Sequence, residues 1–425
     1  MTTVAVIGGG ASGTLVATNL LRCATRPLEV VVIEPRQSLG RGVAYSTTDP
    51  HHLLNVRAKQ MSAVVGDPDH FVRFCGCGRD DFAPRRLYAS YLERLLDEAR
   101  TSSKVSLRHL VTRATRVVRS DDAWVITCAD GSTTSADVVV LATGNPAPTI
   151  PPWADGLVGS PRFIADPWAP GAVEGIGEET VVAIGTGLTF VDVAISVLGS
   201  SKARVIGVSR HGLMPTPHTH VEHPPPLPEL HTPREVLHWL RSQRHQWREA
   251  VNGLRTITQR LWIDWTLDER RQFLRHAHRY WEVHRHRIAE PVAERIAEHL
   301  ASGRLEVRKM RIEEATTTGK RFILRSGSQT LSADRLIVCT GPSERAMLDD
   351  EPIASLRESG HLRPAPLSIG IDCDPRTGHV FDNDGTPSES LYVIGPLRRG
   401  VAWETTAIPE IHVQADDLAR RIATE

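Results

Sequence analysis

The N-terminal stretch Val4-Ala5-Val6-Ile7-Gly8-Gly9-Gly10-Ala11-Ser12-Gly13 decides how this chain folds. An apolar strand runs directly into a glycine turn, and the helix-compatible run Thr14–Leu21 follows it. Gly8, Gly10 and Gly13 have the spacing G-x-G-x-x-G. The first glycine permits a tight turn, the second lets the backbone approach a pyrophosphate, and the third lets the helix pack on the strand. The phosphates of a bound dinucleotide then lie at the N-terminus of that helix.

The next apolar strand ends in an acid. Val30–Ile33 is followed by Glu34, which lies 34 − 13 = 21 residues beyond the last glycine. At this place in a dinucleotide-binding unit a carboxylate accepts a hydrogen bond from a ribose hydroxyl and repels a 2′-phosphate. A glycine turn with an unrelated surface glutamate is the alternative. Strand, turn, helix and acid together favour a dinucleotide without a 2′-phosphate.

The same pattern occurs twice, which indicates a chain built of two similar halves. The second copy begins with the strand Val181–Ile184 and the turn Gly185-Thr186-Gly187. Each copy closes with an apolar strand and a Thr-Gly pair, at Val138–Gly144 and at Leu336–Gly341, after an alternating stretch with a polar turn. Short apolar strands that alternate with helices are typical of parallel sheets covered on both faces. The sequence therefore predicts an α/β fold with two Rossmann-like dinucleotide-binding domains and a helical insertion in the second.

The second glycine turn lacks the third glycine and is followed by a different charge. The strand Arg204–Val208 ends in Ser209 and Arg210, where the first half has Glu34. A guanidinium pairs with a 2′-phosphate in a forked geometry, which favours NADPH in the second half. A solvated basic residue at a strand end is the alternative for Arg210. The contrast between Glu34 and Arg210 assigns two different nucleotides to the two halves, and the one with a 2′-phosphate belongs to the second half.

These patterns also divide the chain. We expect residues 1–165 and 336–425 to form the FAD-binding domain, 166–228 and 301–335 the NAD(P)H-binding domain, and 229–300 the helical insertion. The insertion follows a His/Pro-rich loop at 215–233. Aromatic and apolar residues at helical spacing usually form the core between helices. The alternative is that these residues cover a bound ligand. The residues with this spacing are Trp239, Leu254, Leu261, Trp262, Trp265, Phe273, Tyr280 and Trp281.

The cysteines and histidines predict no metal site. The six cysteines show neither paired zinc spacing nor C-x-x-C, and Cys75 and Cys77 form only C-x-C, for which redox or metal work is a minor alternative. His218, His220 and His223 have no acid or thiolate that completes a zinc site by spacing. We expect the run His284–Arg287 to form a polar helix face toward solvent, with the nucleotide cleft as the alternative.

Charge and hydropathy exclude other classes of partner. Fifty basic residues balance fifty acidic ones, so no overall field attracts nucleic acid or an anionic membrane. No apolar run approaches the roughly 18 to 20 residues that span a bilayer, and Met1 leads into a strand without a signal-peptide pattern. We expect a cytoplasmic protein that binds neither nucleic acid nor membrane. The sequence is compatible with a homo-oligomer.

Several segments resemble known flavoproteins. The N-terminal glycine unit and the late segment Leu391–Pro396 resemble the two-dinucleotide-binding-domain flavoproteins, which implies that the first unit holds FAD and that the late segment returns to the isoalloxazine. The acid usual after the late glycine is Pro396 here. The segments Gly40–Ser46, His52–Val56 and Gly395–Ala407 resemble a group of bacterial FAD/NAD(P)-binding proteins, some of them thought to be N-hydroxylating monooxygenases. The resemblance implies that Arg398 or Arg399 binds an anionic substrate or a cofactor phosphate.

The segment Asn55–Ser62 is similar to the segment after the FAD motif in class B flavin monooxygenases. This resemblance implies that Asn55 helps to hold NADP and a C4a-hydroperoxyflavin, which delivers oxygen to a nucleophilic N or S atom. An ordinary turn or capping role is the alternative for Asn55.

The combined prediction is an FAD- and NADPH-dependent oxidoreductase, a monooxygenase that uses oxygen and a small-molecule substrate. The alternatives are a flavin reductase that does not activate oxygen and a non-catalytic FAD/NAD(P)-binding module. A disulfide reductase is set aside because the first half has no C-x-x-C or C-x4-C pair. Asn55 is the predicted catalytic residue. The predicted cofactor-binding residues are Gly8, Gly10, Ala11, Ser12, Gly13, Glu34, Pro35, Arg36, Tyr45, Asn55, Met61, Thr143, Gly144, Gly185, Gly187, Leu188, Thr189, Ser209, Arg210, Thr340, Gly341, Gly395 and Thr406.

Overall fold

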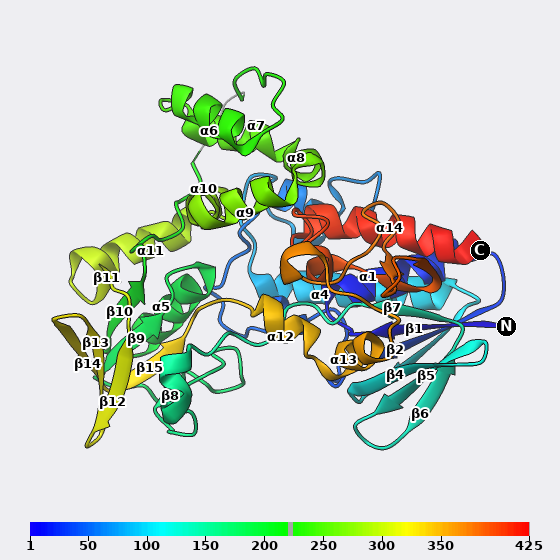
Figure 1. Ribbon diagram of the computed structural model, residues 1–425, viewed down its shortest axis with the longest axis horizontal. Coiled ribbons are helices and arrows are strands. Elements are labelled where there is room, and N and C mark those ends of the chain that lie inside the picture. The colour runs from blue at the N-terminus through cyan, green and yellow to red at the C-terminus, as the bar shows by residue number, and fades with distance from the viewer. Residues whose placement is uncertain (220–223, 425) are drawn as a thin grey trace.

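The computed structural model describes residues 1–219 and 224–424, and it places two parallel sheets side by side (Figure 1). The first sheet has the strand order β16-β17-β7-β1-β2-β3, and only the β16–β17 pair is antiparallel. Its inner strands are apolar and buried on both faces, as a parallel sheet between layers requires. The strands are β1 (Thr2–Ile7), β2 (Leu28–Ile33), β3 (Ser106–Leu110), β7 (Val138–Leu141), β16 (His379–Phe381) and β17 (Pro387–Val393).

The second sheet repeats this arrangement with the order β11-β10-β9-β15-β8, all parallel. In each half the first strand lies between the strand that follows its glycine-turn helix and the closing strand, so the repeat predicted from sequence is present. The strands are β8 (Phe163–Ile164), β9 (Thr180–Ile184), β10 (Arg204–Ser209), β11 (Leu305–Lys309) and β15 (Arg335–Val338). The α/β prediction with two Rossmann-like units is confirmed.

An antiparallel three-stranded meander precedes the closing strand of each half, and it ends in an aspartate with the same contacts. The Asp137 carboxylate accepts from the Thr3 N–H at 2.7 Å, and the Asp334 carboxylate accepts from the Thr180 N–H at 2.8 Å. Each aspartate therefore fixes its meander to the first strand of its own sheet. The meanders are β4 (Ala114–Ser120), β5 (Ala123–Cys128) and β6 (Thr133–Ala136), and β12 (Glu314–Thr318), β13 (Arg321–Ser326) and β14 (Gln329–Ala333).

Helices cover the sheets. α1 (Ala11–Cys23), α4 (Arg85–Ser102) and α14 (Ile408–Thr424) share one hydrophobic core with the first sheet, and α5 (Leu188–Ser200) and α11 (Glu290–Ala301) share one with the second. The shorter elements are α2 (Gly42–Tyr45), η1 (Ala58–Gln60), α3 (His70–Cys75), η2 (Pro152–Leu157), α12 (Glu344–Leu348), α13 (Glu351–Glu358), η3 (Pro366–Ser368) and η4 (Gly395–Arg398). No helix of the described ranges is long and apolar enough to cross a bilayer.

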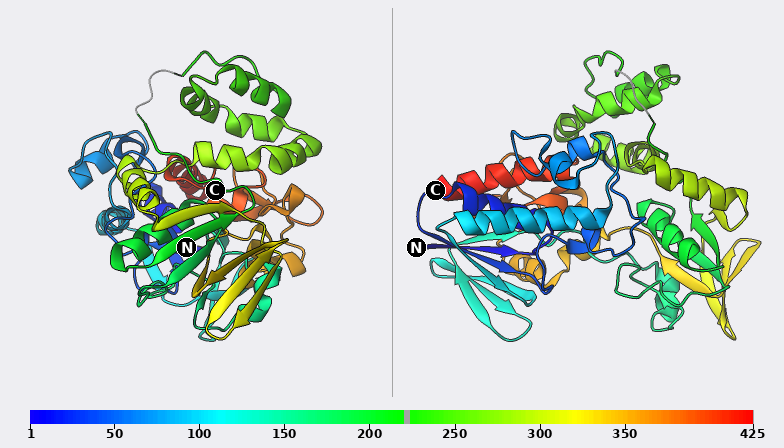
Figure 2. Two further views of the ribbon diagram at one scale, coloured as in Figure 1. Left: turned by 90° about the vertical axis from the view of Figure 1, so that its left-hand side faces the viewer. Right: turned by 180° about the vertical axis from the view of Figure 1, so that it is seen from behind.

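The remaining helices form the insertion, which lies over both halves (Figures 1 and 2). Thr232 and Glu235 form a capping box at the start of α6, and Thr266 and Glu269 form one at the start of α9. The aromatic residues form the core predicted for them, except Tyr280, which is 53% exposed. The helices are α6 (Pro233–Ser242), α7 (Trp247–Arg255), α8 (Thr258–Asp264), α9 (Leu267–His276) and α10 (His278–Arg285).

The insertion core also includes one residue of the first half. The Trp262 and Trp403 ring centroids are 4.3 Å apart, and the Trp262 indole N–H donates to the Gly400 carbonyl at 2.9 Å. The insertion is therefore docked on the loop after η4 as well as joined in sequence to the second half.

The predicted domain boundaries differ from the pairing of the strands at three places. β8 lies within 1–165, and β15 lies almost wholly within 336–425, yet both pair in the second sheet because β15 adds to β9 and β8 adds to β15. α11 was expected in the insertion, but Val292 and Ile296 pack in the core of the second half. The rest of the domain division stays a prediction.

Candidate active site

A cleft of about 2090 Å³ lies between the two halves and beneath the insertion. Both glycine turns line it, and so do the ends of β7 and β10 and residues of α10. In each parallel sheet the carboxyl ends of the strands lie at one edge, and the glycine turn follows the first strand at that edge. Both turns face the cleft. The cleft is the candidate active site.

Gly8 and Gly13 of the first glycine motif have no room for a side chain. Gly8 has a φ of +104°, and a Cβ there would lie 2.5 Å from the Ala142 carbonyl oxygen. A Cβ at Gly13 would lie 1.9 Å from the Gly8 carbonyl oxygen, so only glycine lets α1 pack this closely on β1. Gly10 is the N-cap of α1, and no side chain caps it. The N–H groups of the first turn of α1 are thus available to an anion in the cleft.

The second turn has the same geometry with one substitution. Gly185 has a φ of +105°, and a Cβ there would lie 2.2 Å from the Cys339 carbonyl oxygen. Gly187 caps α5 without a side-chain hydrogen bond, and a Cβ added to it would meet no described atom within 4 Å. Open space therefore lies at this helix N-terminus.

Phe190 occupies the position of the missing third glycine. Its ring is buried, and a Cβ at Gly207 of β10 would lie 2.5 Å from the Phe190 Cζ atom. In the second half the glycine is in the neighbouring strand β10, at Gly207, and its missing side chain leaves space for the Phe190 ring. Gly207 thus allows α5 to pack on the sheet although position 190 is not glycine. The G-x-G-x-x-G spacing alone does not show this, because Gly207 lies outside that motif.

The two strand ends differ in charge as predicted. The buried Glu34 carboxylate accepts from the Gly9 N–H at 2.9 Å and from the Arg36 side chain at 3.0 Å. Arg210 is exposed, lines the cleft, and forms no ion pair within the described ranges. An anion at the Arg210 side of the cleft would meet a free guanidinium.

Arg311 is a cleft residue that the sequence motifs do not predict. β10 and β11 are parallel, with Ser209 opposite Lys309, so Arg210 and Arg311 both follow the same edge of the sheet. Arg311 is exposed, lines the cleft, and has no ion-pair partner among the described residues. The signal was a basic residue just after the third strand of the unit, which becomes informative only once the strand register is known.

Asn55 lines the cleft, and its backbone is fixed by a histidine from the second half. The His218 Nε2 group donates to the Asn55 carbonyl at 2.9 Å. Burial lowers the pKa of His218 to about 4, against the raising effect of the Asn55 carbonyl, so this imidazole is neutral near pH 7. The side-chain amide of Asn55 makes no hydrogen bond to a described residue and is free to bind a ligand.

A buried polar joint holds the loop before Asn55 against α5. Arg85 and Asp192 form an ion pair at 2.8 Å, with side-chain exposures of 10% and 9%. The His52 imidazole contacts the Asp192 carbonyl at 3.1 Å and the Ser196 hydroxyl at 2.9 Å. Charged groups from both halves are thus desolvated together, which fixes the relative position of the two glycine turns.

The late segment returns to the first glycine turn. β17 pairs with β7, and a Cβ at Gly395 would lie 2.7 Å from the Ser12 hydroxyl oxygen at the start of α1. Arg398 is buried and donates to the Pro375 carbonyl at 2.7 Å, away from the cleft lining. Arg399 lines the cleft instead, so of the two arginines only Arg399 is placed to meet a ligand there.

The insertion contributes a charged wall. His278, Glu282 and His286 repeat every four residues on α10 and its end, and Arg399 of the first half approaches the Glu282 carboxylate at 3.3 Å. Burial alone would raise the pKa of Glu282, but His286, His278 and Arg399 outweigh it and hold that pKa below its usual value. The carboxylate is ionised, and it anchors the insertion to the loop that borders the first turn.

The expected solvated face at His284–Arg287 is wrong. Arg285, His286 and Arg287 line the cleft, and Arg287 is only 3% exposed. The segment turns inward because Ile288 and Ala289, which follow it, are buried in the core of the second half.

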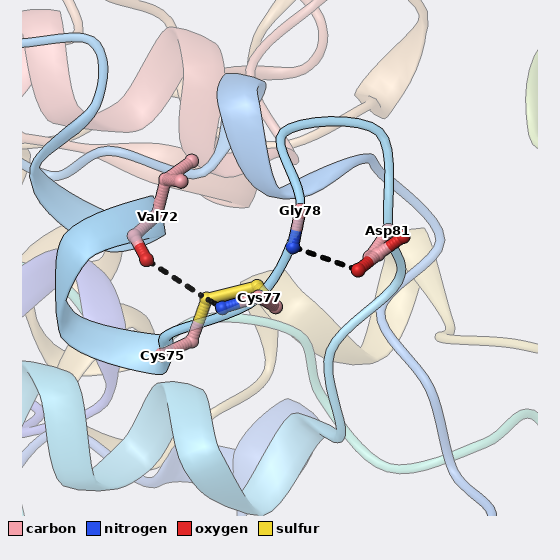
Figure 3. Close-up of a disulfide and its surroundings, with 5 residues drawn as sticks. All are labelled: Val72, Cys75, Cys77, Gly78 and Asp81. Carbon is pink, nitrogen blue, oxygen red and sulfur yellow. Dashed lines mark hydrogen bonds between the residues drawn. A yellow bond between two sulfur atoms is a disulfide. The ribbon is translucent and has the colours of Figure 1, made fainter.

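Cys75 and Cys77 form a disulfide beside α3 (Figure 3). The pair is partly buried, neither cysteine lines the cleft, and the loop is held by the Gly78 N–H, which donates to the Asp81 carboxylate at 2.7 Å. His220 and His223 lie outside the described residues. Among the described residues no cluster of His, Cys, Asp or Glu is arranged to hold a metal ion.

The cleft brings together most of the residues that the sequence predicts for cofactor binding. Three predicted residues do not line it: Gly13 lies beneath the first turn, Pro35 stands between the lining residues Glu34 and Arg36, and Gly395 packs on Ser12. Their roles in binding stay predictions. The predicted residues that line the cleft are Gly8, Gly10, Ala11, Ser12, Glu34, Arg36, Tyr45, Asn55, Met61, Thr143, Gly144, Gly185, Gly187, Leu188, Thr189, Ser209, Arg210, Thr340, Gly341 and Thr406.

Residues 5–146 match the family model for FAD-NAD(P)-binding proteins, which confirms an FAD/NAD(P)-binding domain in the first half. A search of curated protein sequences finds no match.

Solved structures resemble the whole chain at low identity. Ornithine hydroxylase from Pseudomonas aeruginosa, in its reduced form, is 16% identical with a TM-score of 0.66, and 100% of this chain and 98% of that one are covered. Ornithine N-hydroxylase from Kutzneria sp. 744, with reduced FAD, NADP+ and L-ornithine, is 16% identical with a TM-score of 0.64, covering 99% and 98%. Bacillithiol disulfide reductase from Bacillus cereus is 16% identical with a TM-score of 0.58, covering 100% and 99%. These likenesses concern the fold.

Proposed function

We propose that this chain is an FAD- and NADPH-dependent oxidoreductase, and that it is a monooxygenase acting on a small substrate with a nucleophilic N or S atom. One observation carries the proposal: two uncapped helix N-termini, α1 and α5, face one cleft, and the strand ends beside them carry opposite charges. The ornithine hydroxylases share this fold and support the monooxygenase reading.

The first half fits FAD. A Cβ at Gly8 or Gly13 would clash with a backbone carbonyl oxygen, so glycine keeps the turn tight and α1 close to β1, and Gly10, which lines the cleft, leaves the backbone open to a pyrophosphate. The N–H groups of α1 would hold the phosphates, and the Glu34 carboxylate would accept from the ribose hydroxyls. Bound FAD supplies hydride acceptance from a nicotinamide and, once reduced, electrons for oxygen.

The second half fits NADPH. Open space at Gly187 leaves room for a pyrophosphate at the N-terminus of α5. Arg210 and Arg311 follow the same sheet edge and have no carboxylate partner in the described ranges, so a 2′-phosphate would meet two free guanidinium groups. NADH would leave both groups without a partner.

The residues of the chain would bind the two cofactors and orient them toward each other. The free amide of Asn55 would donate to an oxygen atom at the meeting point of the two halves, and His218 holds the backbone of Asn55 in place. The Arg85–Asp192 joint keeps this loop against α5, so the two cofactor sites keep a fixed separation. The insertion is docked by the Trp262–Gly400 hydrogen bond, and its residues form one wall of the cleft.

The test begins with flavin reduction. The purified FAD-loaded protein is mixed with NADPH without oxygen, and flavin absorbance is followed. Reduction is expected in the wild type. Gly187→Asp places a carboxylate at the α5 N-terminus and should abolish reduction while FAD stays bound. Gly199→Asp is the matched control, because Gly199 is exposed at the far end of the same helix and a Cβ there meets no described atom.

Oxygen chemistry is tested next. On admission of air, N- and S-nucleophilic trial substrates should yield hydroxylated products in step with oxygen consumption. Hydrogen peroxide as the sole product with every substrate would contradict the monooxygenase proposal. Fast anaerobic reduction of a quinone with negligible aerobic turnover would select a flavin reductase, and flavin that stays oxidised in excess NADPH would select a non-catalytic binding module.

A further inference from the structure

Arg287 is a buried cation in the wall of the cleft. It follows α10 in the chain, it is 3% exposed, and it lines the cleft. Its Nε atom donates to the His284 carbonyl at 2.9 Å, and its Nη2 atom donates to the Arg248 carbonyl at 3.1 Å. The Nη1 atom makes no hydrogen bond to a described residue. The side chain is therefore held in one orientation with donor capacity left over.

No carboxylate of the described ranges forms an ion pair with Arg287. Its guanidinium lies over the Trp247 ring at 5.6 Å, and Arg248 lies over the same ring at 4.4 Å. Burial lowers the pKa of Arg287 to about 10, assisted by the positive charges of Arg248 and Arg285, while Glu249 opposes this only from a distance. A desolvated charge among like charges is costly unless a negative group pairs with it.

Two other arginines of this region are already paired with carboxylates. Arg285 pairs with Glu404 at 2.8 Å, and Arg57 pairs with Glu290 at 2.6 Å. Two buried atoms beside Arg287, His284 Nδ1 and Arg248 Nε, have no hydrogen-bond partner in the described part of the chain. The cluster Trp247, Arg248, His284 and Arg287 thus contains two cations and two polar atoms without a hydrogen bond, and no carboxylate that the structure describes forms an ion pair with it.

Arg287 lies at the Asn55 end of the cleft. The Ile288 carbonyl, one residue along the chain, accepts from the backbone N–H of His218 at 2.8 Å, and the His218 side chain donates to the Asn55 carbonyl. Arg287 is close enough to contribute to the lowered pKa of His218. The 2′-phosphate expected for NADPH lies elsewhere, at the strand ends that carry Arg210 and Arg311.

We propose that Arg287 is the anion anchor of the acceptor site, so that the substrate carries a carboxylate or phosphate group that pairs with this guanidinium. The proposal rests on the proposed function for the statement that the anion belongs to the substrate. The anion site itself rests only on the burial of Arg287, on its contacts, and on the lack of a carboxylate partner for it among residues 1–219 and 224–424. The two parts can therefore fail separately.

The test uses the FAD-loaded full-length protein, saturated with NADP+ so that the cofactor sites are filled. Inorganic phosphate and acetate are the probes, each titrated at constant ionic strength while the thermal unfolding midpoint is followed. Arg287→Met removes the charge, and Arg241→Met is the matched control because Arg241 is exposed on α6 of the same insertion. Loss of a charge-assisted hydrogen bond should weaken the apparent probe affinity about 10-fold or more in Arg287→Met. The control should match the wild type.

A midpoint shift that persists unchanged in Arg287→Met would overturn the proposal, as would a wild type that responds to neither probe. Should Arg287→Met not fold, Arg287→Lys keeps the charge but loses the forked geometry, and unchanged probe affinity in that variant would also overturn it.

Anaerobic flavin reduction in the same preparations separates the sources of the anion. If Arg287→Met leaves the NADPH concentration for half-maximal reduction unchanged, the anion belongs to the substrate. A rise as large as that in an Arg210→Ala variant would assign Arg287 to the cofactor and overturn the substrate part. A wild type that NADPH does not reduce, but whose phosphate response is lost in Arg287→Met, would overturn the redox function and leave the anion site standing.

Discussion

Removal of Arg210 and Arg311 should convert the second half from an NADPH-selective site into one that no longer distinguishes NADPH from NADH. Both guanidinium groups follow the same edge of the second sheet, both are exposed, and neither has an ion-pair partner in the described part of the chain. Replacement by alanine therefore breaks no ion pair or side-chain hydrogen bond with a residue that the structure describes. The effect should appear in cofactor binding and not in stability.

The magnitude follows from the exposure of the two side chains. Hydrogen bonds to charged groups contribute about 1.5 to 3 kcal/mol, and the low end applies because water competes at exposed sites. About 1.5 kcal/mol corresponds to roughly a tenfold change in affinity. Arg210→Ala and Arg311→Ala should each raise the KM for NADPH about tenfold, and the double variant should raise it about a hundredfold if the two contacts act independently. The KM for NADH should stay within about twofold of the wild-type value.

The assay is steady-state and anaerobic flavin reduction with each nucleotide. Arg275→Ala is the control, because Arg275 is exposed on α9 and does not line the cleft. Equal weakening of NADPH and NADH would refute the reasoning, since it would mean that the arginines act on a part common to both nucleotides. Unchanged KM for NADPH in the double variant would refute it as well.

Three further predictions concern the scaffold. Gly13→Ala should yield protein without bound FAD, because a Cβ would lie 1.9 Å from the Gly8 carbonyl oxygen; the flavin content of the purified protein measures this. Asp192→Asn should lower the free energy of unfolding by about 3 to 5 kcal/mol by leaving the Arg85 charge buried alone, and denaturant titration should show a smaller loss in Arg85→Met/Asp192→Leu. His218 binds fewer protons when folded, because its pKa falls to about 4, so its contribution of at most about 3 kcal/mol is fully present above its unfolded pKa of 6.5 and is lost as pH falls toward 4. His218→Gln should flatten that part of the stability profile.

Each of these predictions has a contrary result. Normal flavin content in Gly13→Ala would show that α1 can shift away from β1. A double Arg85/Asp192 variant as unstable as the single one would show that the packing at this joint matters more than its charge. A stability profile of His218→Gln that keeps the wild-type slope between pH 4 and 6.5 would assign that slope to other groups.

The local motifs could be predicted because their chemistry resides in neighbouring residues. The first turn requires glycine at positions 8 and 13 for steric reasons alone, and the glycine spacing can be recognised in the sequence without a structure. The charge contrast between Glu34 and Arg210 could be predicted because each residue directly follows a strand. The buried aromatic core of the insertion also followed from helical spacing, although Tyr280 did not obey it.

Features that depend on two distant segments could not be predicted. Phe190 fits at a glycine position only because Gly207 lies beneath it in the next strand. Arg311 joins Arg210 only through the register of β10 and β11. The run at His284–Arg287 was expected in solvent because its composition is polar, yet the burial of Ile288 and Ala289 pulls it into the wall of the cleft.

Two glycine turns at the starts of two related sheets can be inferred from the amino-acid sequence alone, because steric demands and strand patterns act over a few residues. The packing of the chain is needed to show that both turns face one cleft and that the insertion forms a wall of it. The same holds for Arg287, which lies in the wall of that cleft with no ion-pair partner among the described residues. Burial and pairing are properties of the packed chain, since a charged side chain becomes an unsatisfied cation only when every neighbour has been placed.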